Sequence, residues 1–344
     1  MKKILFAALL MGATQSTQAQ NEWFQNVKFS GYGMVQYQAS DQDQKETNGF
    51  NLRLVRMALE GRAHEDFYWK VQMQINGNTY DPDNAEKTDI RLVDLFGEWQ
   101  KYEFFKVKAG QFKRPFTFEN PMHPITQGFM SYSQNVSKLA GFSDRCGGNA
   151  SNGRDIGVQI QGDFLKNAEG RNLLHYQVGV FNGEGINQKD KDNRKDIIGG
   201  MWVMPIKGMR IGAFGWTGSR AGVGEKNRYA LSGEYTQNDW TFRSEYIHSQ
   251  GWNAAHTSDK ADGIYALCIA PIQKNKLHVK ARYDLYREAK EWGQSKTMYE
   301  VGADYMFTKN LQINLEYARV NDRTIANPDK HNYNMVDVEL DFRF

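Results

Sequence analysis

Histidines are the side chains of this sequence best suited to acid–base chemistry or metal binding. The chain has seven of them: His64, His123, His175, His248, His256, His278 and His331. None has the spacing of an HExxH metal motif, and none lies beside a recognisable nucleophile motif. The sequence also has no Walker phosphate-binding loop. We therefore expect no catalysis, no metal site and no cofactor.

Other charged side chains are abundant but balanced, with 43 Lys and Arg against 40 Asp and Glu in 344 residues. A general nucleic-acid-binding protein carries a strongly basic face, so the balance argues against that class. The 20 Phe, 17 Tyr and 8 Trp argue against a disordered chain. Mean hydropathy is −0.69, and no apolar run reaches the roughly 18 residues of a membrane-spanning helix. The chain is therefore folded, hydrophilic on average and rich in aromatic residues.

These charges are positioned by segments in which apolar and polar residues alternate. Near the C-terminus, Val336, Leu340 and Phe344 share one face of a strand, and Asp337 and Asp341 share the other. The same pattern occurs in residues 67–76, 276–284 and 311–317. A face with successive charges cannot lie against a dry core, so it must face water while the opposite face meets something apolar.

We predict sixteen such strands. They lie near residues 28–38, 50–62, 67–76, 91–99, 104–112, 154–162, 173–182, 197–204, 209–216, 228–235, 240–247, 262–269, 276–284, 298–306, 311–317 and 333–344.

The connections between these strands alternate in length. Long polar connections occur at 39–48, 77–89, 183–196 and 248–261, and tight turns occur at 62–66, 205–208, 236–239 and 308–310. This alternation predicts an all-β, transmembrane antiparallel β-barrel of about 16 strands, with external loops and periplasmic turns. A barrel of that size encloses an aqueous lumen. A soluble β-sandwich or propeller also has many short strands but does not predict strict long and short alternation.

The N-terminus has the pattern of a cleaved export signal at residues 1–19. Lys2 and Lys3 precede a short apolar segment at 4–11, and residues 17–19 (TQA) form a small-residue cleavage site. The mature barrel would then occupy residues 20–344.

The longest connection follows the fifth strand, at about 113–153. A loop of this length is usually functional. Its apolar residues, Phe116, Phe118, Phe129, Tyr132 and Phe142, suit packing against an inner wall. We predict a loop folded into the lumen that narrows the pore; the alternative is an external loop over the mouth.

Three short motifs support a family resemblance. Residues 110–116 read GQFKRPF and are followed by Glu119, residues 153–158 read GRDIGV, and residues 50–56 read FNLRLVR. In this order they resemble the phosphate-selective porin O and P family over the whole mature chain. The resemblance implies a homotrimeric channel in the Gram-negative outer membrane. Its expected partners are membrane lipid, lipopolysaccharide and the barrel assembly machinery during biogenesis, with no nucleic acid.

The resemblance also implies cations that pass anions toward a phosphate site. The matching positions are Arg53, Arg56, Lys106, Lys108, Lys113, Arg114 and Arg154. The planar fork of Arg matches an oxyanion, and several weak sites suit conduction better than one tight site.

The expected lumen face is mixed rather than basic, which departs from the family pattern. Acidic residues on the polar faces are Glu60, Asp94, Glu98, Glu234, Glu245, Glu300, Glu316, Asp337, Glu339 and Asp341. Each candidate cation could therefore serve instead as a wall charge paired with a neighbouring carboxylate. The mixed face therefore argues against strong phosphate selectivity.

The leading hypothesis is a water-filled channel for passive diffusion of small hydrophilic solutes, including anions such as phosphate. The alternative is an adhesin or glycan-binding barrel that acts through aromatic residues of its external loops, such as Tyr80, Trp252 and Trp292.

Overall fold

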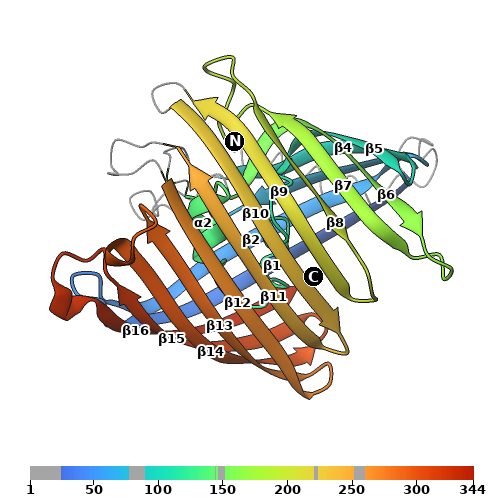
Figure 1. The fold of residues 1–344 in the computed structure, drawn as a ribbon. Helices are drawn as coiled ribbons and strands as arrows, with labels where there is room; N and C mark the ends of the chain where they lie inside the picture. The colour runs from blue at the N-terminus through green and yellow to red at the C-terminus, as the bar shows by residue number, and fades with distance from the viewer. Residues whose placement is uncertain (1–24, 77–89, 144, 146–151, 221–223, 252–259) are drawn as a thin grey trace, which may run out of the picture.

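The computed structural model describes residues 25–76, 90–143, 145, 152–220, 224–251 and 260–344. The expected signal at 1–19 and the mature start at Gln20 lie outside these residues. Sixteen antiparallel strands close into one barrel in chain order (Figure 1). The barrel closes where β1 (Gln25–Ser40) pairs with β16 (Asn332–Arg343), with Tyr32 opposite Arg343 and Gln36 opposite Glu339. The predicted all-β barrel of sixteen strands is confirmed.

The strands are β1 (Gln25–Ser40), β2 (Thr47–His64), β3 (Phe67–Gln74), β4 (Arg91–Tyr102), β5 (Phe105–Lys113), β6 (Arg154–Lys166), β7 (Asn172–Phe181), β8 (Asp196–Val203), β9 (Met209–Arg220), β10 (Gly224–Gln237), β11 (Trp240–Gln250), β12 (Lys260–Gln273), β13 (Leu277–Glu288), β14 (Ser295–Thr308), β15 (Leu311–Asp322) and β16 (Asn332–Arg343). The helices within the described residues are α2 (Gln134–Leu139), η3 (Trp292–Gln294) and η4 (Pro328–Lys330). No helix among the described residues has the length and apolar character needed to cross a membrane.

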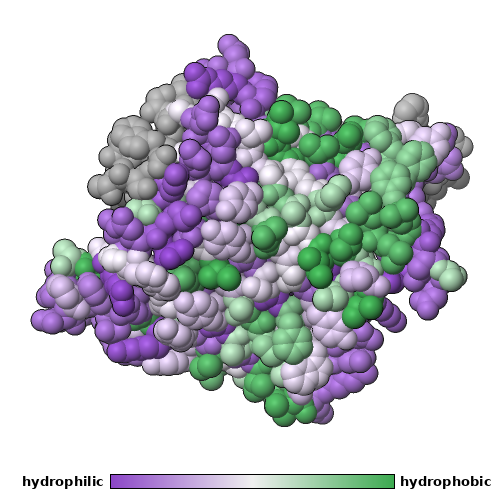
Figure 2. Space-filling model, viewed as in Figure 1, coloured by the Kyte–Doolittle hydropathy of each residue, from purple (hydrophilic) through white to green (hydrophobic). Residues whose placement is uncertain are grey.

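Where a strand has one polar face, that face points into the barrel, whereas β8 and β9 bury Ile198, Phe214 and Trp216 on the inside. In β16, Glu339 and Asp341 are 1% and 2% exposed, whereas Leu340 and Phe342 are each 38% exposed on the outside. Figure 2 shows hydrophobic side chains gathered at the right of the view, where Figure 1 places β6 to β8. Exposed residues there are Val158, Val178, Val180, Ile197 and Met201. This distribution is the one that a barrel in a bilayer requires.

The long connections and the tight turns lie at opposite ends of the barrel (Figure 1). The strands are longer than predicted at the long-loop end: residues 41–46 alone connect β1 to β2, and residues 221–223 alone connect β9 to β10. Ladder hydrogen bonding continues beyond the apolar belt, where both strand faces are polar. The alternation of apolar and polar residues along the sequence therefore stops before the strand ends.

The apolar core lies between the long connection after β5 and the wall. Phe116 and Phe118 of this connection are 0% and 1% exposed, and their rings contact Phe214 and Trp216 of β9 edge-on at 5.4 to 6.4 Å between centroids. Helix α2 belongs to the same segment and is capped by Ser133, whose hydroxyl accepts from the Val136 N–H. Wall side chains do not fill a sixteen-stranded barrel, so these aromatic residues occupy space that the wall leaves open.

Candidate functional site

Inward-facing carboxylates of three strands accept hydrogen bonds from the backbone of the connection between β5 and β6, hereafter the long loop (residues 114–153). Glu245 of β11 accepts from the N–H groups of Phe118 and Glu119, both at 2.8 Å. Asp284 of β13 accepts from the Gln134 N–H, and Glu316 of β15 from the Met130 N–H, also at 2.8 Å. These carboxylates fasten the long loop to the wall by charge-assisted hydrogen bonds.

Inward-facing cations of neighbouring strands bind the loop's carbonyl oxygens in the same way. The donor and acceptor pairs are Arg228 to Leu139 (3.0 Å), Arg243 to Gln127 (3.0 Å), Lys280 to Gly128 (3.0 Å) and Arg282 to Ser131 (2.9 Å). Buried backbone groups need hydrogen-bond partners, and this segment has little regular structure of its own. Charged side chains of β10 to β15 therefore supply the hydrogen bonds that a helix or sheet would otherwise give to the loop's backbone.

Glu119 is the long loop's own buried carboxylate. It is 0% exposed and accepts from the backbone N–H of Ser133 at 3.1 Å and from the Ser133 hydroxyl. Burial raises the pKa of Glu119 above its usual value, because desolvation disfavours the charged form. This contact joins the start of the loop to the N-cap of α2.

Five of the seven predicted cations form ion pairs with carboxylates. The pairs are Arg53 with Glu339 (3.0 Å), Lys106 with Asp163 (3.4 Å), Lys108 with Glu98 (3.6 Å), Arg114 with Asp155 (2.9 Å) and Arg154 with Asp94 (2.6 Å). Arg114 and Arg154 lie at the two ends of the long loop and are each 3% exposed. The Arg114–Asp155 pair joins the two ends of the loop, since Asp155 directly follows Arg154. The Arg154–Asp94 pair fixes the second end to β4.

The other two predicted cations, Arg56 and Lys113, donate hydrogen bonds to uncharged groups. Arg56 donates to Oε1 of Gln74 at 3.1 Å and to the hydroxyl of Tyr32 at 3.1 Å. Lys113 donates to the carbonyl of Met122 at 2.6 Å and to the hydroxyl of Tyr132 at 2.7 Å. Lys113 therefore also holds the long loop.

The inner wall of β3 to β6 carries three partly exposed lysines. Here Lys70, Lys106 and Lys108 keep 25%, 26% and 18% of their side chains exposed. Lys70 lies 3.9 Å from Glu60. The three lysine–carboxylate distances, 3.4 to 3.9 Å, are longer than the 2.6 Å between Arg154 and Asp94. Three of the seven predicted residues, Lys113, Arg114 and Arg154, hold the long loop. Lys106 and Lys108 are partly exposed wall cations, and Arg53 and Arg56 bind the wall residues Glu339 and Gln74.

Sequence reasoning did not assign a role to Glu245, Asp284 or Glu316. The period-two pattern placed Glu245 and Glu316 on polar faces, and this was the only signal available. Their partners lie between 126 and 186 positions away along the chain. No local pattern identifies such contacts.

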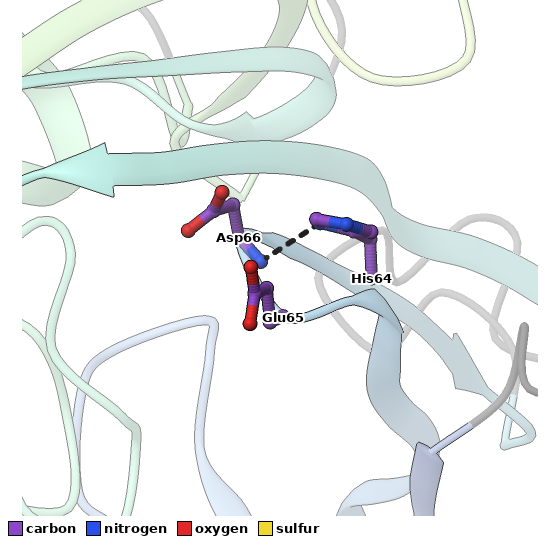
Figure 3. Close-up of side chains that lie close together, drawn as sticks. All are labelled: His64, Glu65 and Asp66. Carbon is purple, nitrogen blue, oxygen red and sulfur yellow. Dashed lines mark hydrogen bonds between the residues drawn. The ribbon is translucent and has the colours of Figure 1, made fainter.

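Histidine and acidic residues meet in the turn between β2 and β3. Figure 3 shows His64, Glu65 and Asp66 there, with the Asp66 N–H donating to Nδ1 of His64 at 3.3 Å. Among the described residues this is the group of three whose ligand atoms lie within 4.8 Å of one another. Because His64 and Glu65 are exposed and Nδ1 is already engaged, the cluster fits a solvated turn.

Of the loop aromatics suggested for glycan binding, Tyr80 and Trp252 lie outside the described residues. Trp292 lies in η3, is 54% exposed, and has the Arg287 guanidinium 5.2 Å from its ring centroid.

Comparison with known proteins gives both a family and a set of similar folds. A model of the Gram-negative porins matches residues 7–324. No curated protein sequence matches the chain. An anion-selective porin from Comamonas acidovorans has a TM-score of 0.68 at 13% identity, covering 93% of this chain and 99% of its own. OmpF from Salmonella typhi, in complex with daunomycin, has 0.67 at 12% identity, covering 95% and 99%.

Two further structures are similar at lower scores. OprB from Pseudomonas putida has a TM-score of 0.65 at 9% identity and covers 97% of both chains. The trimer form of OmpT, an outer membrane protein from Vibrio cholerae, has 0.60 at 12% identity, covering 93% of this chain and 99% of its own. At these identities the likeness concerns the fold alone.

Proposed function

Because the chain belongs to the Gram-negative porin family, we propose that its barrel is a water-filled outer-membrane channel through which small hydrophilic solutes diffuse passively. The charged inner face carries this proposal. A polar inner face around a wide lumen admits water, and the apolar outer face meets lipid. Flux through such a channel follows the solute gradient and depends on pore width and wall charge.

The constriction in this proposal lies between the long loop and the wall of β3 to β6. The wall charges of β10 to β15 hold the loop through its backbone N–H and carbonyl groups. Lys70, Lys106 and Lys108 on the opposite wall remain partly exposed. Solutes would therefore pass these lysines, while Arg114 and Arg154 keep the loop in place.

A modest anion preference, with phosphate as one permeant, is part of the proposal. The lysines pair with Glu60, Asp163 and Glu98 at 3.4 to 3.9 Å, so the wall is only weakly basic in effect. Weak, successive sites allow an anion to leave as well as enter. This preference is also what the resemblance to the phosphate-selective porins implies.

The test is the reversal potential of single channels in planar bilayers under a KCl gradient. Stepwise conductance with a reversal potential on the anion side is expected. Lys106→Glu with Lys108→Glu should move the reversal potential toward cations, because two partly exposed positive charges become negative. Lys330→Glu, at an exposed ion pair in η4, is the matched control and should leave it unchanged. A well-folded barrel without conductance would contradict the channel, and an unmoved reversal potential would contradict the anion preference.

A homotrimer embedded in lipid and lipopolysaccharide, inserted by the barrel assembly machinery after removal of residues 1–19, completes the proposal. The trimer form recorded for OmpT supports this assembly as a precedent within the fold. Cross-linking of the purified protein tests the trimer, and N-terminal sequencing tests the cleavage site.

A further inference from the structure

Two aromatic rings lie on the inner, water-facing side of the wall, where the alternation of polar and apolar residues would place polar side chains. Tyr68 of β3 lies opposite Glu98, and Phe96 of β4 lies opposite Lys70. Both side chains are partly exposed, and their ring centroids are 6.0 Å apart. An aromatic surface that faces the lumen is informative, because a polar lining does not require it.

These rings are held in fixed positions by their neighbours. Phe96 packs edge-on against the buried Phe112 at 6.0 Å, which supports it from behind while part of the ring stays exposed. The Tyr68 hydroxyl donates to Glu60 at 2.8 Å. Rings fixed in this way lose little conformational entropy when a ligand stacks on them.

Hydrogen-bond donors and acceptors alternate around the two rings. Lys108 Nζ lies 5.0 Å from the Phe96 centroid and 3.6 Å from Glu98. Lys70 Nζ lies 3.9 Å from Glu60. The two lysines and the two carboxylates cancel in charge. The Lys70–Glu60 pair is partly exposed on both sides, so a hydroxyl group can accept from Lys70 and donate to Glu60. Glu98 is buried and already accepts from Gln100 and Gln161, so Lys108 is the member of its pair that a ligand can reach.

We propose that Tyr68 and Phe96, with the Lys70–Glu60 and Lys108–Glu98 pairs, form a binding station for neutral saccharides in transit through the channel. The C–H face of a pyranose ring would lie on the aromatic rings, and its hydroxyls would bridge Lys70 and Glu60 and accept a hydrogen bond from Lys108. Aromatic residues combine a large apolar face with tolerance of nearby polar groups. Because each lysine is paired with a carboxylate, an anion is held only weakly here, and an uncharged polyhydroxylated ligand can also bind through its hydroxyl groups and its apolar ring face. This inference rests on the proposed channel.

The test uses the full protein in planar bilayers, with maltose and maltotriose added to an open channel. We expect a dose-dependent reduction of ion current by both saccharides. Phe96→Leu should raise the half-blocking concentration about two- to tenfold, which is the effect of losing one aromatic stacking contact. Tyr68→Leu should act in the same direction, and it provides a second variant if Phe96→Leu does not fold. The control is Phe307→Leu, the same change at a residue on the outer face whose side chain is 55% exposed. It should leave both the saccharide block and the open-channel conductance unchanged.

Three outcomes separate this inference from the channel itself. Normal conductance without block by either saccharide would overturn the saccharide station and leave the channel intact. Block by benzoate but not by maltose would overturn it in favour of an aromatic anion site. A folded protein without conductance would overturn the channel, and the station with it.

Discussion

Replacing Glu245 by Ala should release the start of the long loop from the wall. Glu245 accepts from the N–H groups of Phe118 and Glu119 at 2.8 Å and from the Tyr265 hydroxyl at 2.7 Å, and it also accepts from Ser232. Alanine leaves these donors buried without an acceptor. Each unsatisfied buried donor costs about 1 to 3 kcal/mol, so the two backbone groups alone cost about 2 to 6 kcal/mol.

Hydrogen exchange of the Phe118 and Glu119 amides measures this cost directly. A loss of about 2 kcal/mol corresponds to exchange about thirtyfold faster. Current noise through single channels should rise as well, because a loosened loop fluctuates within the lumen. Glu245→Gln keeps one acceptor oxygen and should give a smaller effect on both measurements.

The matched control is Asp304→Ala. Asp304 is also an inner-wall carboxylate and accepts from His278 at 2.8 Å, a contact that does not involve the loop. It should leave exchange of both amides unchanged. If Glu245→Ala also leaves their exchange unchanged while the barrel stays folded, the conclusion that wall carboxylates fasten the loop is wrong.

Two further predictions concern the charges at the loop. Arg154→Ala leaves Asp94, which is 7% exposed, without its guanidinium partner. It should lower the free energy of unfolding of the barrel by about 3 to 5 kcal/mol in thermal or denaturant unfolding. The double variant Arg154→Ala with Asp94→Ala should recover part of that loss, and no recovery would contradict the pairing. Burial raises the pKa of Glu119, so its contribution to stability is fully present below the unfolded-state pKa and is lost as the pH rises through the folded-state pKa. Protease cleavage within residues 114–143 should therefore increase with pH, and Glu119→Gln should flatten this dependence; an unchanged profile in Glu119→Gln would assign the pH effect to another group.

Much of the architecture follows from local sequence patterns. The period-two alternation in residues such as Val336 to Phe344 reports which face of a strand meets lipid, and this property depends only on neighbours along the chain. For the same reason the strand count and the alternation of long and short connections could be read without a structure. The ends of β1 and β9 could not, because their ladders continue where neither face is apolar.

The roles of the charges depended on contacts distant in the sequence. The motifs around Arg114 and Arg154 marked the ends of the long loop. Asp94 lies 60 positions from Arg154 and reaches it because β4 and β6 both flank β5. Glu245 and Phe118 are 127 positions apart.

A barrel with a charged interior follows from the sequence, since alternation is a local property of the chain. Which charges hold the loop and which face water depends on contacts between distant strands. A carboxylate on an inner wall has the same sequence pattern in either role, and its hydrogen-bond partner is set by the closure of the barrel.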